Sequence, residues 1–149
     1  MSIGNSFLNK KETIGGRAER VWREIRHRYP AGGTITNLSD WATDGIIPSG
    51  RPVVYDPEAK TMSVLTTSQV EAGATTANDT TTYNGDSLGI NGYLQEDVVI
   101  NVNAGSVPTG LVASGTVVYA GELYAYMFGA TELAVLQSVT KVPEVRFVY

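Results

Sequence analysis

The chain has 149 residues, which is close to the usual length of one globular domain and leaves little room for a second one. Only 17% of the residues are charged and 42% are hydrophobic, and together with the 16 glycines this composition favours β-structure over a helical bundle. The chain has no cysteine and one histidine, which excludes disulfides, thiolate zinc sites and a cysteine nucleophile, and argues against histidine metal sites.

The net charge of −4 is unevenly divided along the chain. Residues 1–30 hold seven basic and three acidic residues, a net charge of +4, whereas residues 31–149 hold four basic and twelve acidic residues, a net charge of −8. This division predicts a basic N-terminal arm over residues 1–30 and an acidic, β-rich domain over residues 31–149. Two surfaces of opposite charge suggest two different partners.

Within the arm, we expect a flexible polar stretch over residues 1–16 and an amphipathic helix over residues 17–29. Apolar residues recur in the second segment at spacings of three and four: Ala18, Val21, Trp22, Ile25 and Tyr29. This spacing is typical of one face of an α-helix. Pro30 and the two glycines that follow it soon after are expected to end the helix.

From Thr34 onwards the pattern changes to short strands separated by turn residues. Residues 34–38 are expected to be extended, and residues 46–50 contain the Pro and Gly of a turn. Residues 51–55 and 61–66 are predicted to form a hairpin. The Thr-rich segment 69–86 is either a long surface loop or a pair of edge strands.

The C-terminal third is more apolar. Four further strands are expected there, over residues 88–94, 98–102, 116–120 and 122–128. A bend or bulge at Gly121 would separate the last two. A short helix is predicted over residues 130–139, and the apolar chain end at 145–149 is expected to be tied into a sheet or a subunit contact.

No arrangement of residues points clearly to catalysis. His27 is the only histidine and has no identifiable partner base, so a solvated helical position is the preferred interpretation. Asp40 with Asp44, and Glu96 with Asp97, are carboxylate pairs, which we interpret as turn or rim charges. Neighbouring residues on a strand point to opposite faces, so Glu96 and Asp97 are poorly placed to share a proton.

Hard oxygen ligands are also present in the polar segment: Asn78, Asp79, Asn84 and Asp86. Their spacing does not match an EF-hand loop, and a solvated loop accounts for them without bound calcium. The sequence also has no phosphate-binding loop and no dinucleotide fingerprint. We therefore expect no cofactor, no metal site and no enzymatic activity.

The clustered arginines of the arm could neutralise nucleic-acid phosphates, but the acidic domain would repel a polyanion. We therefore predict a protein partner, with Trp22 and Ile25 as apolar anchors and basic residues around them. The predicted contact residues are Lys10, Lys11, Arg17, Arg20, Trp22, Arg23, Ile25 and Arg26.

Residues 34–149 contain a succession of short motifs. Residues 36–41 read T-N-L-S-D-W, residues 47–53 I-P-S-G-R-P-V, residues 92–98 G-Y-L-Q-E-D-V and residues 118–124 V-Y-A-G-E-L-Y, and the chain closes with V-R-F-V at 145–148. In this order, the motifs resemble those of capsid-surface proteins of tailed bacteriophages, namely head decoration and head-fibre proteins. The basic arm and the Thr-rich insert at 66–86 depart from a minimal decoration domain.

The resemblance implies a compact β-barrel-like or β-sandwich-like decoration domain with one short C-terminal helix, here preceded by the basic helical arm. It also implies a homotrimer on the outer surface of the virion, bound to the major capsid protein and stapling neighbouring capsid subunits. Assembly in the host cytoplasm fits the lack of cysteine. No segment approaches about 18 apolar residues and no signal core is visible, so we expect no membrane contact.

Three alternatives remain open. The first is a carbohydrate- or host-surface-binding β-module of a virion fibre, with a platform of tyrosines: Tyr83, Tyr93, Tyr119, Tyr124, Tyr126 and Tyr149. The second is an enzyme that uses Glu96 and Asp97 as an acid pair. The third is a protein inside the head that contacts DNA through the arginines.

Overall fold

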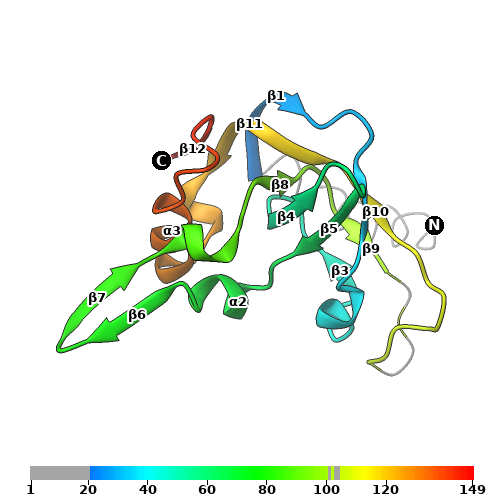
Figure 1. Ribbon diagram of the computed structural model, residues 1–149, viewed down its shortest axis with the longest axis horizontal. Helices are drawn as coiled ribbons and strands as arrows, with labels where there is room; N and C mark the ends of the chain where they lie inside the picture. Colours follow the sequence, from blue (N-terminus) through cyan, green and yellow to red (C-terminus); the bar gives the residue numbers. More distant parts are fainter. Residues whose placement is uncertain (1–20, 101, 103–104) are drawn as a thin grey trace, which may run out of the picture.

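The computed structural model describes residues 21–100, 102 and 105–149. The prediction of a mainly β fold is confirmed, and the main sheet curls into half a barrel (Figure 1). In the described part of the chain this sheet has eight strands: β1 (Trp22–Arg28), β2 (Gly33–Ile35), β4 (Pro52–Asp56), β5 (Thr61–Val64), β8 (Gly92–Leu94), β10 (Ser114–Gly115), β11 (Val117–Tyr124) and β12 (Val145–Val148). Seven of them follow the order β1-β11-β8-β4-β5-β2-β10, and β12 pairs with β11.

The remaining elements are shorter. Two small antiparallel sheets pair β3 (Ile46–Ile47) with β9 (Val98–Val99) and β6 (Ala74–Ala77) with β7 (Thr80–Tyr83). The helical elements are η1 (Leu38–Trp41), α2 (Thr67–Glu71), η2 (Gly85–Leu88), η3 (Ala125–Met127) and α3 (Ala130–Gln137). No described helix has both the length and the apolar composition needed to cross a bilayer.

Strand β11 organises the sheet. Its one edge pairs with β1 in antiparallel orientation, while its other edge pairs first with β8 and then, in parallel orientation, with β12. Two strands therefore follow one another along a single edge, and the sheet divides at this point. The core divides with it, into one cluster around α3 and β12 and a second around η1, β4 and β5.

The expectation of two strands separated at Gly121 is wrong, because β11 runs without interruption through this residue. Gly121 faces β1, and a Cβ atom there would meet the backbone oxygen of Glu24 and the ring of Trp22. The glycine is therefore required by the close approach of a neighbouring strand, which is a long-range cause that the local sequence does not reveal.

The helix predicted over residues 17–29 is wrong for residues 22–28, which form β1. This strand carries three register shifts against β11, and each shift disturbs the alternation of side chains. As a result Trp22 is buried and Ile25 and Tyr29 are partly buried, so inward-facing positions recur at helical spacing on a bulged strand.

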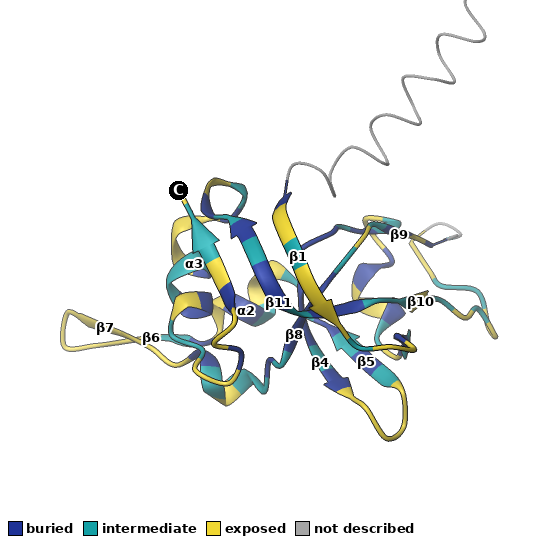
Figure 2. Ribbon diagram, turned by 90° about the horizontal axis from the view of Figure 1, so that it is seen from above, coloured by how far each residue is buried: buried dark blue, intermediate teal, exposed yellow. Residues whose placement is uncertain are grey.

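The predicted boundary at residue 30 does not separate β1 from the domain, because β1 belongs to the main sheet (Figure 2). The predicted flexible stretch at 1–16 and the first residues of the predicted helix, 17–20, lie outside the described residues.

Several local predictions are confirmed. Strands β4 and β5 form the expected hairpin, α3 lies in the predicted C-terminal helix, and β12 ties the apolar chain end into the sheet. Of the two alternatives for the Thr-rich segment, the structure has the pair of strands, β6 and β7, joined by a two-residue turn at Asn78 and Asp79. Both turn residues have positive φ, as a tight hairpin turn requires. The short helix α2, just before this hairpin, was not expected.

Asp86 in η2 ties the hairpin base to the chain after α3. Its carboxylate accepts hydrogen bonds from the hydroxyl and the backbone N–H of Thr140, at 2.7 and 2.8 Å. These bonds, the hydroxyl bond foremost, lower the pKa of Asp86 below the ordinary value of 3.8.

A folded-state pKa below the unfolded value means that ionised Asp86 stabilises the fold above pH 3.8, and that this contribution is lost as the pH falls through the lowered pKa. An NMR titration of the Asp86 carboxyl carbon is expected to give a midpoint below 3.8. Thr140→Val should raise this midpoint, since it removes the hydroxyl donor. An unchanged midpoint in Thr140→Val would contradict the assignment.

Candidate functional site

The motifs at 47–53, 92–98 and 118–124 meet at a joint between strands. The N–H of Gly50 donates to the carbonyl of Leu94, and the N–H of Leu94 donates to the carbonyl of Arg51, both at 2.8 Å. The N–H of Ser49 donates to the Asp97 carboxylate at 2.7 Å. Gly50 has a φ of +82°, and a Cβ atom there would collide with Val21. These hydrogen bonds therefore hold the start of β4 against β8, and β8 pairs in turn with β11.

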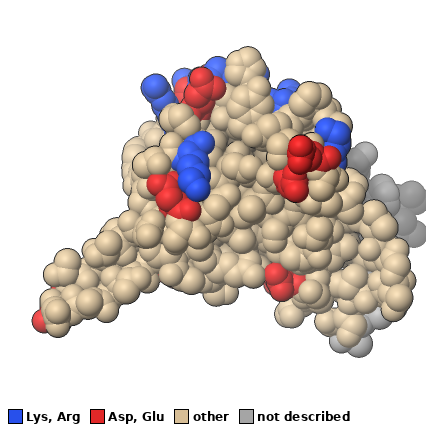
Figure 3. Space-filling model, in the orientation of Figure 1, with Lys and Arg blue, Asp and Glu red and all other residues tan. Residues whose placement is uncertain are grey.

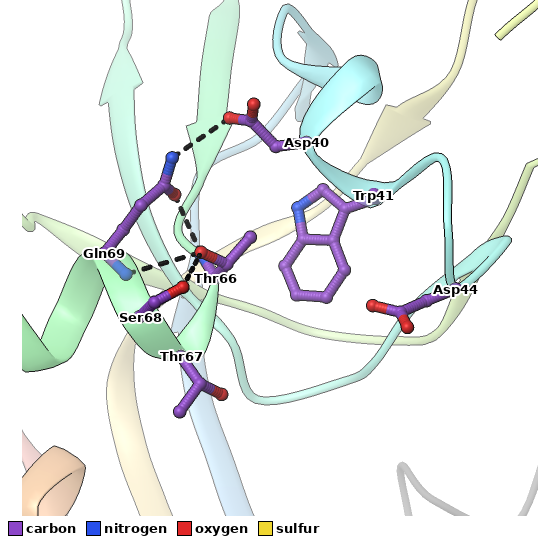
Figure 4. Close-up of a pocket in the computed structure, with 7 residues that line it drawn as sticks. All are labelled: Asp40, Trp41, Asp44, Thr66, Thr67, Ser68 and Gln69. Carbon is purple, nitrogen blue, oxygen red and sulfur yellow. Dashed lines mark hydrogen bonds between the residues drawn. The ribbon is translucent and has the colours of Figure 1, made fainter. Parts of the chain in front are cut away.

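A pocket of about 430 Å³ lies between η1 with its following turn and the first turn of α2 (Figure 4). The first side contributes Asp40, Trp41 and Asp44, and the second contributes residues 66–69. The two sides are separated by more than twenty residues in sequence, and the hairpin β4–β5 brings them together.

Trp41 is largely buried at this pocket, with only 5% of its surface exposed. Its indole N–H donates to the carbonyl of Val64 at 3.1 Å. The guanidinium carbon of Arg51 lies 6.0 Å from the centroid of its ring, within the range of a cation–π contact. The hydrogen bond to Val64 therefore fixes the edge of the indole ring, and Arg51 packs against one of its faces.

The rim of the pocket is held by hydrogen bonds between its two sides. The carboxylate of Asp40 accepts from the side-chain amides of Gln69 and Asn37, each at 3.1 Å. Thr66 and Gln69 form a capping box at the start of α2, in which the N–H of Thr66 donates to the Gln69 side chain at 2.9 Å. Within the described residues, Asp44 has no hydrogen-bond or ion-pair partner, so its exposed carboxylate is available to a ligand.

The predicted contact residues of the arm are only partly described. Lys10, Lys11, Arg17 and Arg20 lie outside the described residues. Trp22, predicted as an exposed anchor, is instead a core residue with 6% of its surface exposed, and its indole N–H donates to the carbonyl of Leu94. The prediction failed because it placed Trp22 on a free helix rather than on a strand packed against the domain.

The other three contact residues also lie on β1, where Ile25 packs against the core and the two arginines face outward. Ile25 is half-buried, while Arg23 and Arg26 are exposed. Arg23 pairs with Glu122 at 2.6 Å, and Arg26 lies 3.6 Å from Glu24 and donates to a backbone carbonyl. These two basic side chains are thus partly neutralised by neighbouring acidic residues.

The hairpin arm, which we define as residues 74–83, extends away from the rest of the described structure (Figures 1 and 3). Ala74 is half-buried and every following residue of the hairpin arm is exposed. Asp79 at the tip is its only charged residue. No sequence signal beyond the Thr-rich composition indicated this projection.

The tyrosines proposed as a sugar platform do not share one surface. Tyr93 is buried in the core, whereas Tyr126 is 69% exposed and lies beside Tyr124, with 5.4 Å between ring centroids. Tyr119 is half-buried and stacks on the ring of His27 at 5.9 Å. His27 is exposed as predicted, but on a strand rather than on a helix.

The remaining polar candidates are dispersed or already bonded. Asp97 accepts the Ser49 N–H, and its neighbour Glu96 is exposed. Asn78 and Asp79 form the tip of the hairpin arm, while Asp86 binds Thr140 beyond its base. No group of three or more His, Cys, Asp or Glu side chains in the described part of the chain is arranged to hold a metal ion.

Comparison of the chain with protein-family models, with curated proteins and with solved structures gave no match.

Proposed function

We propose that this chain is an auxiliary capsid protein of a tailed bacteriophage, of the head decoration or head-fibre kind, which binds the outside of the assembled shell and joins neighbouring major capsid subunits. The ordered motifs of residues 34–149 suggest this class of protein. The structural observation that carries the proposal is the hairpin arm, because it offers a means of reaching a neighbouring subunit.

The hairpin arm packs little against the rest of its own chain. A two-stranded hairpin is at best marginally stable in water, and the residues from 75 to 83 are all exposed. Its four residue pairs give a reach of about 13 Å at ~3.3 Å per residue. The outer edges of β6 and β7 are unpaired within the described residues, so either strand can extend a sheet of a neighbouring subunit.

Binding of this kind would stabilise the shell, because the protein would bind the assembled shell but not its separated subunits. If the protein forms a trimer, as the resemblance suggests, each trimer carries three hairpin arms. Several weak contacts then act together and give a high overall affinity. The basic residues Lys10, Lys11, Arg17 and Arg20 remain proposed contacts of the same interaction.

Shortening the hairpin arm tests this proposal. A variant in which residues 76–81 are replaced by Asn-Gly keeps a tight turn but removes most of the exposed hairpin. We expect its thermal midpoint to stay within a few degrees of the parent chain, and its apparent affinity for undecorated heads to fall at least about tenfold in co-sedimentation.

Two controls accompany this experiment. Asp79→Asn keeps the positive φ that asparagine tolerates and should leave head binding unchanged if strand pairing dominates. Removing residues 1–20, which leaves β1 in place, tests the proposed basic contacts in the same assay. Full occupancy of the heads by the shortened-hairpin variant would refute the proposed role of the hairpin arm.

A further inference from the structure

We propose that the pocket between η1 and α2 binds a saccharide that carries no negative charge, with an amino sugar as the best fit. This inference is independent of the proposed capsid role, because it rests on the residues of the pocket and not on the hairpin arm.

The chemistry of the lining suits a ring with many hydroxyl groups. Trp41 is 5% exposed, and the small exposed part of its ring gives the C–H groups of a sugar one apolar contact. The carboxylates of Asp40 and Asp44 accept hydrogen bonds from sugar hydroxyls, and the hydroxyls of Thr67 and Ser68 can both donate and accept them. Every lining residue except Trp41 is polar, so the pocket suits a ligand rich in hydroxyl groups better than an apolar one. Its volume of about 430 Å³ lies within the usual range of ~300–1,000 Å³ for small-ligand sites.

Charge determines which saccharides fit. The lining contains two acidic residues and no basic residue, so the pocket is negatively charged. A uronic acid or a sulfated sugar would be repelled, whereas the ammonium group of an amino sugar would be attracted. Arg51 does not reverse this preference, because its charge is buried and is neutralised by Glu132 at 2.8 Å.

The pocket is ordered before a ligand arrives. Asp40 is held by Gln69 and Asn37, and Trp41 is held by Val64 and Arg51. A site that is already fixed loses little conformational entropy on binding. Asp44 is left with an uncommitted carboxylate at the rim, and it is therefore the side chain whose removal should affect the ligand and not the fold.

The experiment is a ¹⁵N–¹H NMR titration of the full chain with glucosamine, glucose, glucuronate and ethanolamine. The two indole N–H groups give an internal comparison, because Trp41 lies at the pocket and Trp22 is buried elsewhere against Leu94. We expect glucosamine and glucose to shift the Trp41 signal with dissociation constants of about 1–10 mM, glucosamine binding more tightly, while the Trp22 signal stays in place.

Asp44→Asn should weaken glucosamine binding about tenfold, since a charge-assisted hydrogen bond is lost. Asp79→Asn, which changes the same charge at the tip of the hairpin arm, should leave the dissociation constant unchanged. No shift of the Trp41 signal with either glucosamine or glucose would overturn the proposal. The proposal would also be overturned if glucuronate bound as tightly as glucosamine. A third contradicting result would be that ethanolamine binds as tightly as glucosamine while glucose does not bind.

Discussion

Arg51→Met is expected to destabilise the fold by about 3–5 kcal/mol, which is a large part of the stability of a domain of this size. Arg51 and Glu132 form an ion pair of 2.8 Å, and each residue is only 4% exposed. Without Arg51, the Glu132 carboxylate would be left buried and unpaired, and the carbonyl of Leu65 would lose the hydrogen bonds it accepts from the guanidinium.

The pair is buried between the two core clusters, since Arg51 lies over Trp41 of one cluster and Glu132 lies on α3, whose apolar residues belong to the other. Burial, as the largest effect, raises the pKa of the nearby Tyr93 above its ordinary value, and the same burial disfavours an isolated charge at Arg51 or Glu132. Arg51 immediately precedes β4, and Glu132 lies on α3. The ion pair therefore fixes the helix against the central sheet as well as balancing two charges.

Urea unfolding of Arg51→Met, Glu132→Leu and the double variant measures this contribution. The double variant should recover part of the stability lost in the single variants, because both buried charges are removed together. Recovery should be incomplete, since the Leu65 hydrogen bonds and the contact with Trp41 are lost as well. A loss of less than about 1 kcal/mol in each single variant would contradict this role, because such a loss is typical of an exposed ion pair.

Trp22→Ala is expected to destabilise the fold by about 3–5 kcal/mol, the usual cost of removing a large aromatic side chain from a core. The indole is buried at 6% exposure, and its N–H donates to the carbonyl of Leu94 at 3.3 Å. A tryptophan on a free, exposed arm would give almost no change in stability. Thermal or urea unfolding of this variant therefore distinguishes the two placements of residues 22–28.

Two neighbouring positions on β1 provide controls. Ile25→Ala should cost less than Trp22→Ala, because Ile25 is smaller and only half-buried. Arg23→Ala should cost no more than about 1 kcal/mol, since its ion pair with Glu122 is on the exposed face of the strand. Equal losses of stability at Trp22 and Arg23 would contradict the packing of β1 described above.

The candidate pocket could not have been predicted from the sequence, even though its residues are visible there. Asp40 and Asp44 form a carboxylate pair in the sequence, and their spacing alone predicted only turn or rim charges. Gln69 is brought to Asp40 by the β4–β5 hairpin and is held in place by the capping box of α2. The spacing of these residues along the chain does not indicate this contact. The Arg51–Glu132 pair was missed for the same reason, because 80 positions separate two residues in direct contact.

Features that depend on residues close together in the chain could be predicted from the sequence. The hairpin of β4 and β5, the helix α3 and the paired strand β12 follow from local alternation, helical spacing and turn residues. Features in which distant segments meet depend instead on the three-dimensional fold. Strand β1 is a strand because β11 pairs with it, Gly121 is a glycine because β1 passes close to it, and the pocket exists because the β4–β5 hairpin brings η1 to α2. Local preferences are worth only tenths of a kcal/mol per residue, so the pairing of a whole strand readily outweighs them.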